Sequence, residues 1–162
     1  QLTGPNGVGK SSLMRILAGL LRPLSGDIRR EGQTALLDER HALEAHLPLG
    51  RALDFWARCD RVPADRMAEV ARATGVADLL DVPVRYLSTG QRKRAALARL
   101  VGQRAQIWLL DEPLNGLDRE AVTMCEALVA EHCANGGIAL IASHQMFTLP
   151  GLATLPLADF VP

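Results

Sequence analysis

Hydrophobic residues follow two patterns along the chain. Over residues 10–21 they recur at helical spacing, which predicts a helix. Short runs of apolar residues instead predict strands at Thr34–Leu37, Ile107–Leu110 and Ile138–Ala142, of which the last two are expected to be buried. The long stretch between residues 41 and 102 is rich in Ala, Leu and Arg and has few β-branched residues, which predicts several helices.

The order of these segments predicts a single α/β domain. A further helix is expected over residues 119–134, and the resulting strand–helix–strand order is typical of a parallel sheet. We expect a core lobe of residues 1–38 and 104–162 and an inserted α-helical lobe of about residues 39–103. A chain of 162 residues is long enough to bury a core of this kind.

Composition and charge narrow the class of protein. Eighteen Lys and Arg residues balance 18 Asp and Glu residues, so no global field favours nucleic acid or anionic lipid. No uncharged apolar run approaches the roughly 20 residues that span a membrane. Three cysteines without a Cys-x-x-Cys pair are typical of reduced structural thiols. We therefore expect a soluble intracellular domain, and its first residue, Gln1, suggests a fragment whose natural start is missing.

The segment GPNGVGKS, residues 4–11, matches the phosphate-loop pattern G-x-x-x-x-G-K-[ST] without a mismatch. Glycines let backbone N–H groups approach phosphate oxygens, and the following helix adds about half a positive charge at its N-terminus. Lys10 is expected to reach the β- and γ-phosphates, and the Ser11 hydroxyl to bind Mg²⁺. The alternative is a glycine-rich turn that caps a helix through Ser11 or Ser12. The predicted triphosphate-binding residues are Gly4, Pro5, Asn6, Gly7, Val8, Gly9, Lys10, Ser11 and Ser12.

Two acids follow the strand predicted at Ile107–Leu110. Because ligands of open α/β sheets bind at the carboxyl ends of the strands, Asp111 is expected to hold Mg²⁺, directly or through water. Glu112 is the candidate general base on the attacking water. His144 ends the other apolar strand, where it is predicted to donate a hydrogen bond to the γ-phosphate and to sense ATP versus ADP. The alternatives are a solvated Asp-Glu-Pro turn and a structural or exposed histidine.

A second candidate anion site lies in YLSTGQRKRAALARL, residues 86–100. Ser88 and Gly90 precede a predicted helix, so a hydroxyl and backbone N–H groups meet at a helix N-terminus. A serine cap on an Arg-rich surface helix is the alternative. The segment resembles the LSGGQ signature of ABC ATPases, with Thr89 in place of the second glycine, and NGLD, residues 115–118, resembles the D-loop of that family. Four basic residues near the signature are expected mainly on a solvated face: Arg92, Lys93, Arg94 and Arg99.

The resemblance to ABC ATPases implies a P-loop NTPase (RecA-like) parallel sheet with an inserted α-helical lobe. It also implies antiparallel strands before the phosphate loop, with an aromatic residue that stacks on adenine, and we expect these to be missing from this sequence. In that family two nucleotide-binding domains pack head to tail, and each ATP lies between one phosphate loop and the signature of the partner. In a homodimer, Ser88, Gly90, Gln91 and Asp118 would then contact ATP held by the second copy.

Further segments resemble the ATP-binding subunit of the haem exporter of cytochrome c maturation, among them LPLGRALDFW, IWLLDEPLNGLD and NGGIALIASHQM. The resemblance implies an ATP-hydrolysing export subunit, peripheral on the cytoplasmic face of the bacterial inner membrane. Its expected partners are ATP, Mg²⁺ and an integral membrane subunit, with no direct contact to nucleic acid. The apolar cluster within Ala45–Trp56 would meet that subunit or simply pack the helical lobe. Glu39 stands at the position of the Q-loop glutamine, where this branch often carries histidine.

Two other functions stay open on the sequence alone. The first is a soluble ABC ATPase acting on nucleic acid or ribosomes, which is disfavoured by the neutral charge and by the lack of a long coiled-coil insertion before the signature. The second is an inactive nucleotide-binding or scaffold module, which is supported by two departures from the family's motifs, Glu39 and Thr89.

Overall fold

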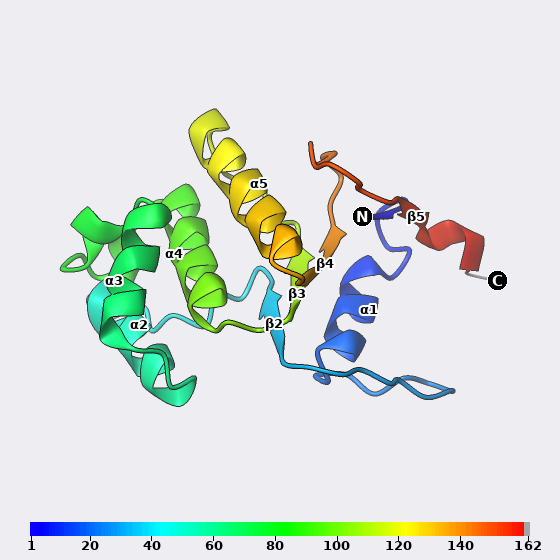
Figure 1. The fold of residues 1–162 in the computed structure, drawn as a ribbon, viewed down its shortest axis with the longest axis horizontal. Helices are drawn as coiled ribbons and strands as arrows, with labels where there is room; N and C mark the ends of the chain where they lie inside the picture. The colour runs from blue at the N-terminus through cyan, green and yellow to red at the C-terminus, as the bar shows by residue number, and fades with distance from the viewer. Residues whose placement is uncertain (161–162) are drawn as a thin grey trace. The chain divides into compact units, whose positions relative to one another are not determined.

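The computed structural model describes residues 1–160, which pack into two compact units (Figure 1). Unit 1 comprises Gln1–Glu39, Ala105–Leu114 and the described residues from Glu126 onward. Unit 2 comprises Arg40–Arg104 and Asn115–Cys125. The lobes expected from the sequence differ from these units at residues 115–125, which pack with unit 2, and by one residue each at Glu39 and Arg104. As functional lobes they stay a prediction.

Unit 1 is built on a five-stranded parallel sheet with the order β2-β3-β4-β1-β5. The strands are β1 (Leu2–Thr3), β2 (Thr34–Leu37), β3 (Ile107–Asp111), β4 (Ile138–Ala142) and β5 (Leu155–Pro156). The predicted bounds of β2 and β4 are confirmed, and β3 extends one residue further, to Asp111. A short 3₁₀ helix, Leu157–Phe160, follows β5. Parallel order in the sheet agrees with the predicted α/β class.

The first helix, α1 (Lys10–Leu17), packs against β3 and β4. Its side chains enclose a core that includes Leu2, Met14 and Leu109. The helix is shorter than the predicted range of 10–21, because Gly19 adopts a left-handed φ of +79° and the Leu20 N–H bonds back to the Arg15 carbonyl. This glycine-terminated geometry ends helices in general.

Strand β4 is buried only at its carboxyl end, at Ile141 and Ala142, whereas Ile138 is exposed. The prediction of a strand buried along its whole length is therefore wrong. The reason is that β1 spans only two residues and pairs with β4 at Ala142 alone, so the start of β4 has β3 as its one neighbour in the described sheet. The buried end of β4 is the end that leads to His144.

Unit 2 is helical. It contains α2 (Leu49–Cys59), α3 (Ala64–Ala73), α4 (Thr89–Gly102) and the first residues of α5, and two 3₁₀ helices at Ala77–Leu79 and Val84–Tyr86. α5 (Arg119–Ala134) continues from unit 2 into unit 1. The three complete helices pack against one another through apolar side chains that include Leu49, Leu53, Val70, Leu97 and Leu100. The helices predicted between residues 41 and 102 are confirmed.

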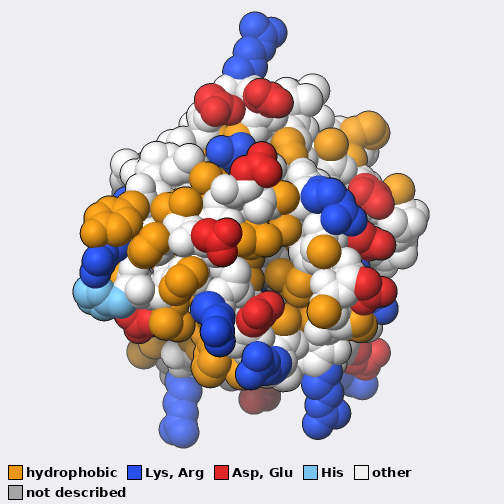
Figure 2. Space-filling view, turned by 90° about the vertical axis from the view of Figure 1, so that its left-hand side faces the viewer, with side chains coloured by type: hydrophobic (Ala, Val, Ile, Leu, Met, Phe, Trp, Pro, Cys, Tyr) orange, Lys and Arg blue, Asp and Glu red, His pale blue; other side chains and the backbone are white. Residues whose placement is uncertain are grey.

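Four further observations concern a buried lysine, the cysteines, the length of the helices and the surface charge. Lys93 in α4 is only 4% exposed, so the expectation of a solvated face is wrong for this residue. Within residues 1–160 the three cysteines form no disulfide, and no helix is both long and apolar enough to cross a membrane. On the face drawn in Figure 2, apolar side chains lie between basic and acidic ones, so neither sign of charge dominates there.

Candidate functional site

The predicted residues of unit 1 follow the carboxyl ends of three neighbouring strands. β1 leads into the phosphate loop, β3 ends at Asp111 and is followed by Glu112, and β4 is followed by Ser143 and His144. β4 lies between β3 and β1, and all three strands are parallel. These groups therefore gather at one edge of the sheet, which is where α/β proteins bind ligands.

The phosphate loop has a backbone that only glycine adopts readily. Gly7 and Gly9 have φ values of +82° and +106°, and a Cβ on either residue would meet no atom within 4 Å. Gly9 is the N-cap of α1 and provides no side-chain cap. The alternative in which Ser11 or Ser12 caps this helix is therefore wrong. A helix N-terminus without a side-chain cap, reached through an open glycine loop, favours an anion.

Lys10 folds back onto the phosphate loop. Its Nζ donates hydrogen bonds to the carbonyl oxygens of Gly4, at 2.8 Å, and Pro5, at 3.1 Å, and the residue is buried. Both acceptors are neutral, so these bonds place the ammonium charge inside the loop without neutralising it. Charge-assisted bonds to a phosphate are stronger than bonds to neutral carbonyls, so an arriving phosphate can replace these acceptors.

Asp111 and Ser11 have the donor chemistry expected of Mg²⁺ ligands. The Asp111 carboxylate is buried at the end of β3, and Ser11 is exposed in the first turn of α1. Carboxylate and hydroxyl oxygens suit Mg²⁺, which proteins hold with one or two carboxylates together with substrate phosphates. In the part of the chain that the structure describes, no group of three or more His, Cys, Asp or Glu side chains could hold a metal ion. One carboxylate and one hydroxyl, from Asp111 and Ser11, are the ligands expected for a Mg²⁺ ion whose other ligands are phosphate oxygens and water.

Glu112 and His144 lie together. The Glu112 Oε1 is 3.5 Å from Nε2 of His144, and its Oε2 is 3.4 Å from both the Ser143 hydroxyl and the His144 backbone nitrogen. Glu112 has a φ of +47°, which is rare for a residue with a side chain, and its backbone N–H donates to the Ala142 carbonyl at 2.7 Å. This backbone strain turns the carboxylate away from the line of β3 and towards the end of β4.

The four predicted residues of unit 2, Ser88, Gly90, Gln91 and Asp118, line one pocket of about 320 Å³ together with Thr89, Arg94 and Gly116. Ser88 is the N-cap of α4, because its hydroxyl oxygen accepts from the Gln91 backbone N–H at 3.1 Å, while the side-chain Oε1 of Gln91 accepts from the Ser88 backbone N–H at 2.8 Å. The serine cap considered as an alternative is thus present. It uses the hydroxyl oxygen as an acceptor, which leaves the hydroxyl proton to donate.

Two glycines bring the signature and the D-loop segment into close contact within this pocket. A Cβ on Gly90 would lie 2.8 Å from the Gly116 carbonyl oxygen, and a Cβ on Gly116 would lie 3.1 Å from the Thr89 methyl group. Gly90 belongs to the first turn of α4, which begins at Thr89, so the prediction that Gly90 precedes the helix is wrong. Asp118, the last residue of the D-loop segment, caps α5: its Oδ1 accepts from the Ala121 N–H at 2.8 Å.

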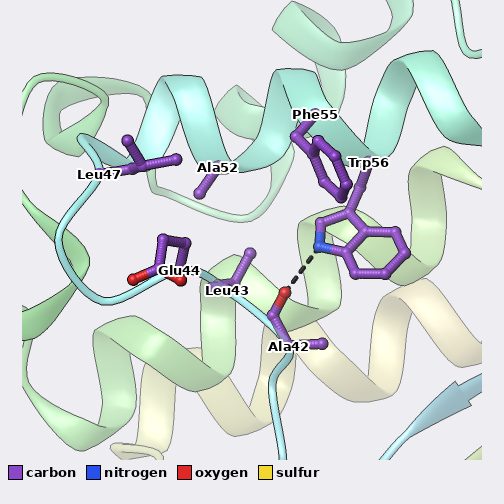
Figure 3. A pocket seen from close by; sticks show the side chains of 7 residues that line it. All are labelled: Ala42, Leu43, Glu44, Leu47, Ala52, Phe55 and Trp56. Carbon is purple, nitrogen blue, oxygen red and sulfur yellow. Dashed lines mark hydrogen bonds between the residues drawn. The ribbon is translucent and has the colours of Figure 1, made fainter.

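A second, apolar pocket of about 510 Å³ lies on unit 2 (Figure 3). The Trp56 Nε1 donates to the Ala42 carbonyl at 2.6 Å and fastens the segment before α2 beside the pocket. Phe55 and Leu47 are exposed, whereas Leu49 and Leu53 of the same predicted cluster are buried in the helical core. The packing interpretation is therefore right for part of that cluster. The pocket is lined by Ala42, Leu43, Glu44, Leu47, Ala52, Phe55 and Trp56.

The sequence motifs do not point to Gln1 or Ser143, although both are buried polar residues at the sheet edge. Each stands beside a motif, Gln1 before the phosphate-loop strand and Ser143 before His144. A polar residue next to an apolar strand end is the one signal that could have drawn attention to them, and it is a weak signal. Only the sheet order brings Gln1 and Ser143 together.

The chain belongs to the ABC transporter family, whose model matches residues 1–115. It is 56% identical over 161 residues to the cytochrome c biogenesis ATP-binding export protein CcmA of Novosphingobium aromaticivorans, covering 99% of this chain and 82% of that protein. The protein of the same name from Sphingopyxis alaskensis is 52% identical, with 94% of this chain and 78% of that protein covered. A putative ABC transporter ATP-binding protein from Pyrococcus furiosus has the same fold, with a TM-score of 0.81 and 21% identity over 98% of this chain and 83% of that one.

Family membership confirms the resemblance drawn from the motifs, and with it the P-loop α/β fold. Members of this family bind ATP and couple its hydrolysis to transport, so the chain is an ATP-binding protein and an ATPase. Among the functions left open by the sequence, an inactive scaffold is therefore disfavoured. The individual roles of the site residues stay predictions.

Proposed function

We propose that this chain is the MgATP-driven subunit of a haem exporter for cytochrome c biogenesis, and that it works as a head-to-tail homodimer. We also propose that it lies peripherally on the cytoplasmic face of the bacterial inner membrane, bound to an integral membrane subunit. One observation carries the catalytic part: the phosphate loop, Asp111 and the Glu112–His144 pair follow three adjacent strand ends. The export role is supported by the 56% identity to a relative that is named for it.

Residues 4–12 bind the triphosphate. The glycine backbone and the uncapped start of α1 offer N–H groups to phosphate oxygens, and Lys10 exchanges its bonds to Gly4 and Pro5 for bonds to the β- and γ-phosphates. Ser11 and Asp111 would hold Mg²⁺, which would supply positive charge against the phosphates. Asp111 is buried, so few water molecules can compete for its carboxylate.

Glu112 and His144 act on the attacking water and the γ-phosphate. The Glu112 carboxylate takes a proton from the water as the water oxygen attacks phosphorus, and the bond from phosphorus to the bridging oxygen breaks. His144 donates a hydrogen bond to the γ-phosphate, and its contact with Glu112 holds that carboxylate in place. The bond from the Ser143 hydroxyl restrains the second carboxylate oxygen in the same way.

The pocket at the start of α4 binds the triphosphate held by a second copy of the chain. The Ser88 hydroxyl proton and the backbone N–H groups of the first turn of α4 are suitable donors to phosphate oxygens. Arg94 lines the same pocket and adds a positive charge. Asp118, which caps α5, fixes the D-loop segment beside these donors.

The apolar pocket of Figure 3 accepts a cytoplasmic segment of the membrane subunit. Exposed Phe55 and Leu47 offer apolar surface that water solvates poorly, and the Glu44 carboxylate beside them suits a segment that also carries a basic residue. An amphipathic helix or turn with one apolar anchor matches this combination.

Co-purification of the full-length protein with its integral membrane subunit, followed by a cytochrome c maturation assay in cells, tests the proposal. We expect the wild-type protein to co-purify and to support maturation, and Phe55→Arg to lose both while it stays folded. Phe160→Arg is the matched control, because Phe160 is also exposed, at 68% against 58% for Phe55, but belongs to unit 1 and does not line the pocket. Wild-type maturation with Phe55→Arg would remove the docking role of the pocket, and a folded wild-type protein that binds no membrane subunit would contradict the export function.

A further inference from the structure

The side chain of Gln1 is bonded to the segment that carries His144. Its Nε2 donates to the carbonyl oxygens of Ser143, at 3.2 Å, and Gln145, at 2.8 Å, while its Oε1 accepts from the Phe147 backbone N–H at 3.2 Å. Gln1 is only 6% exposed. One buried carboxamide therefore holds backbone groups on both sides of His144.

The chemistry of a carboxamide suits this position. Residues 143–147 lie outside helices and strands, so their backbone groups depend on partners other than a regular ladder. A glutamine offers two donor hydrogens and one acceptor oxygen, which match two carbonyls and one N–H. A carboxylate of the same shape could accept hydrogen bonds but not donate them, and an apolar side chain could do neither. Either replacement would leave buried backbone groups without hydrogen-bond partners.

The backbone segment held by Gln1 is the one that contacts Glu112. The Ser143 hydroxyl and the His144 backbone N–H both approach the Glu112 Oε2 at 3.4 Å, and the Ser143 oxygen also accepts from the Gln145 N–H at 3.1 Å. The Gln1 carboxamide and the Glu112 carboxylate thus both contact the same short segment, residues 143–147. A shift of this turn would change the distance between His144 and Glu112.

Gln1 directly precedes β1, the strand that enters the phosphate loop. Its backbone carbonyl accepts from the Leu155 N–H at 2.8 Å, and the next residue, Leu2, is fully buried and pairs with Ala142. The backbone of Gln1 is therefore bonded to the sheet, and its side chain holds residues 143–147 at a fixed distance from β1. The phosphate-loop strand and the histidine turn share one anchor.

We propose that Gln1 is a positioning residue for ATP hydrolysis, which holds His144 in register with Glu112 and with the phosphate loop. This inference rests on the roles proposed above for Glu112 and His144. Gln1 itself touches no reacting atom, so its removal should slow the chemical step and leave nucleotide affinity largely unchanged.

The test is a double-mutant cycle in the full-length protein assembled with its membrane subunit. Gln1→Glu keeps the shape and loses both donors, and we expect kcat to fall about tenfold to a hundredfold with a KM for ATP within about twofold of wild type. His144→Ala alone should hydrolyse slowly and accumulate as a closed, ATP-bound dimer. If Gln1 acts through His144, adding Gln1→Glu to His144→Ala should lower kcat by less than about twofold further. A structural role would not produce this non-additivity.

Gln1→Met keeps the length of the side chain without polar atoms and serves as the second variant, with the same expected pattern. Gln106→Leu is the control. Gln106 lies in another part of unit 1, and its side-chain Oε1 accepts a hydrogen bond from the Gln33 backbone N–H. Wild-type kcat in Gln1→Met, or losses that multiply fully with His144→Ala, would overturn the positioning role. Wild-type kcat in His144→Ala would instead overturn the proposed role of the histidine itself, so the two failures are distinguishable.

Discussion

The Glu112 carboxylate faces the His144 imidazole across the ends of β3 and β4, with 3.5 Å between Oε1 and Nε2. The Glu112 side chain is 15% exposed and that of His144 is 48% exposed, so the carboxylate is sheltered while the imidazole can reach a ligand. The contact exists because Glu112 adopts a φ of +47° and turns towards β4. Two residues that stand 32 positions apart in the chain therefore lie in direct contact.

Glu112→Gln should separate binding from catalysis. The amide keeps the size and the acceptor oxygen of the carboxylate but cannot take a proton from water, so we expect turnover to slow by about a hundredfold or more with ATP still bound. Steady-state ATPase rates and equilibrium nucleotide binding measure the two effects. Glu126→Gln is the matched control, because Glu126 accepts from the Thr148 N–H at 2.7 Å through an oxygen that glutamine retains. Turnover at the wild-type rate in Glu112→Gln would remove this residue from the role of base.

Lys10→Ala should weaken ATP binding. The variant loses the ammonium group that now bonds to the Gly4 and Pro5 carbonyls, and charge-assisted bonds contribute about 1.5–3 kcal/mol each. We expect the Kd for ATP to rise by about tenfold to a hundredfold, measured by titration with a fluorescent nucleotide. Arg15→Ala is the control from the same helix, because Arg15 lies near Asp38, at 3.9 Å, rather than in the loop. An unchanged Kd in Lys10→Ala would contradict the phosphate-binding role of the loop.

Gly116→Ala should impair the pocket at the start of α4. The substitution strains a φ of +79° and brings its methyl group 3.1 Å from the Thr89 methyl group. Gly136→Ala is the control, because it introduces the same backbone strain without a close contact. Gly136 has a φ of +85°, and a Cβ there would meet nothing within 4 Å. Both variants should lose about 1–2 kcal/mol of unfolding free energy from the backbone term, and only Gly116→Ala should also lower ATPase activity and ATP-dependent dimerisation. Equal activity of the two variants would show that the Thr89–Gly116 contact has no functional weight.

The motifs and the apolar runs were sufficient to predict the phosphate loop, the strands at Thr34–Leu37 and Ile138–Ala142, and the helical segments, because each is encoded locally. The contact of Gln1 with Ser143 was not predictable in this way. It joins residues 142 positions apart and depends on β1 lying next to β4, which no local pattern reveals. The positive φ of Glu112 likewise arises from tertiary contacts, since nothing in Asp-Glu-Pro favours it.

The burial of Lys93 and the partial exposure of the predicted apolar cluster have a related cause. Helical spacing indicates that a segment has two faces, but the neighbours of each face are set by how α2, α3 and α4 pack. Leu53 is directed into that packing, and Phe55, two residues later, is directed outward. The sequence pattern therefore indicated an apolar cluster in this region, but it did not indicate which residues of the cluster line the pocket of Figure 3.

The stability of the protein should fall at mildly acidic pH through His132. The imidazole stacks on Trp108 with 3.9 Å between ring centroids, and burial lowers the pKa of His132 from its ordinary value of 6.5, although backbone hydrogen bonds to Ile138 and Gln106 act in the opposite direction. Because the unfolded chain then binds a proton more readily than the folded one, this group stabilises the fold fully above pH 6.5 and loses that contribution as the pH falls towards the folded-state pKa.

His132→Phe preserves a ring on Trp108 and removes the titration, so urea midpoints at pH 7.5 and pH 5 should differ less in the variant than in the wild type. All other ionisable residues are the same in the two proteins, so their contributions to the pH dependence cancel in this comparison. Since stacking is retained, a change in the pH dependence reports the proton on His132 and not the loss of packing against Trp108. The same difference in midpoint for both proteins would mean that His132 is equally basic in the folded and unfolded chain.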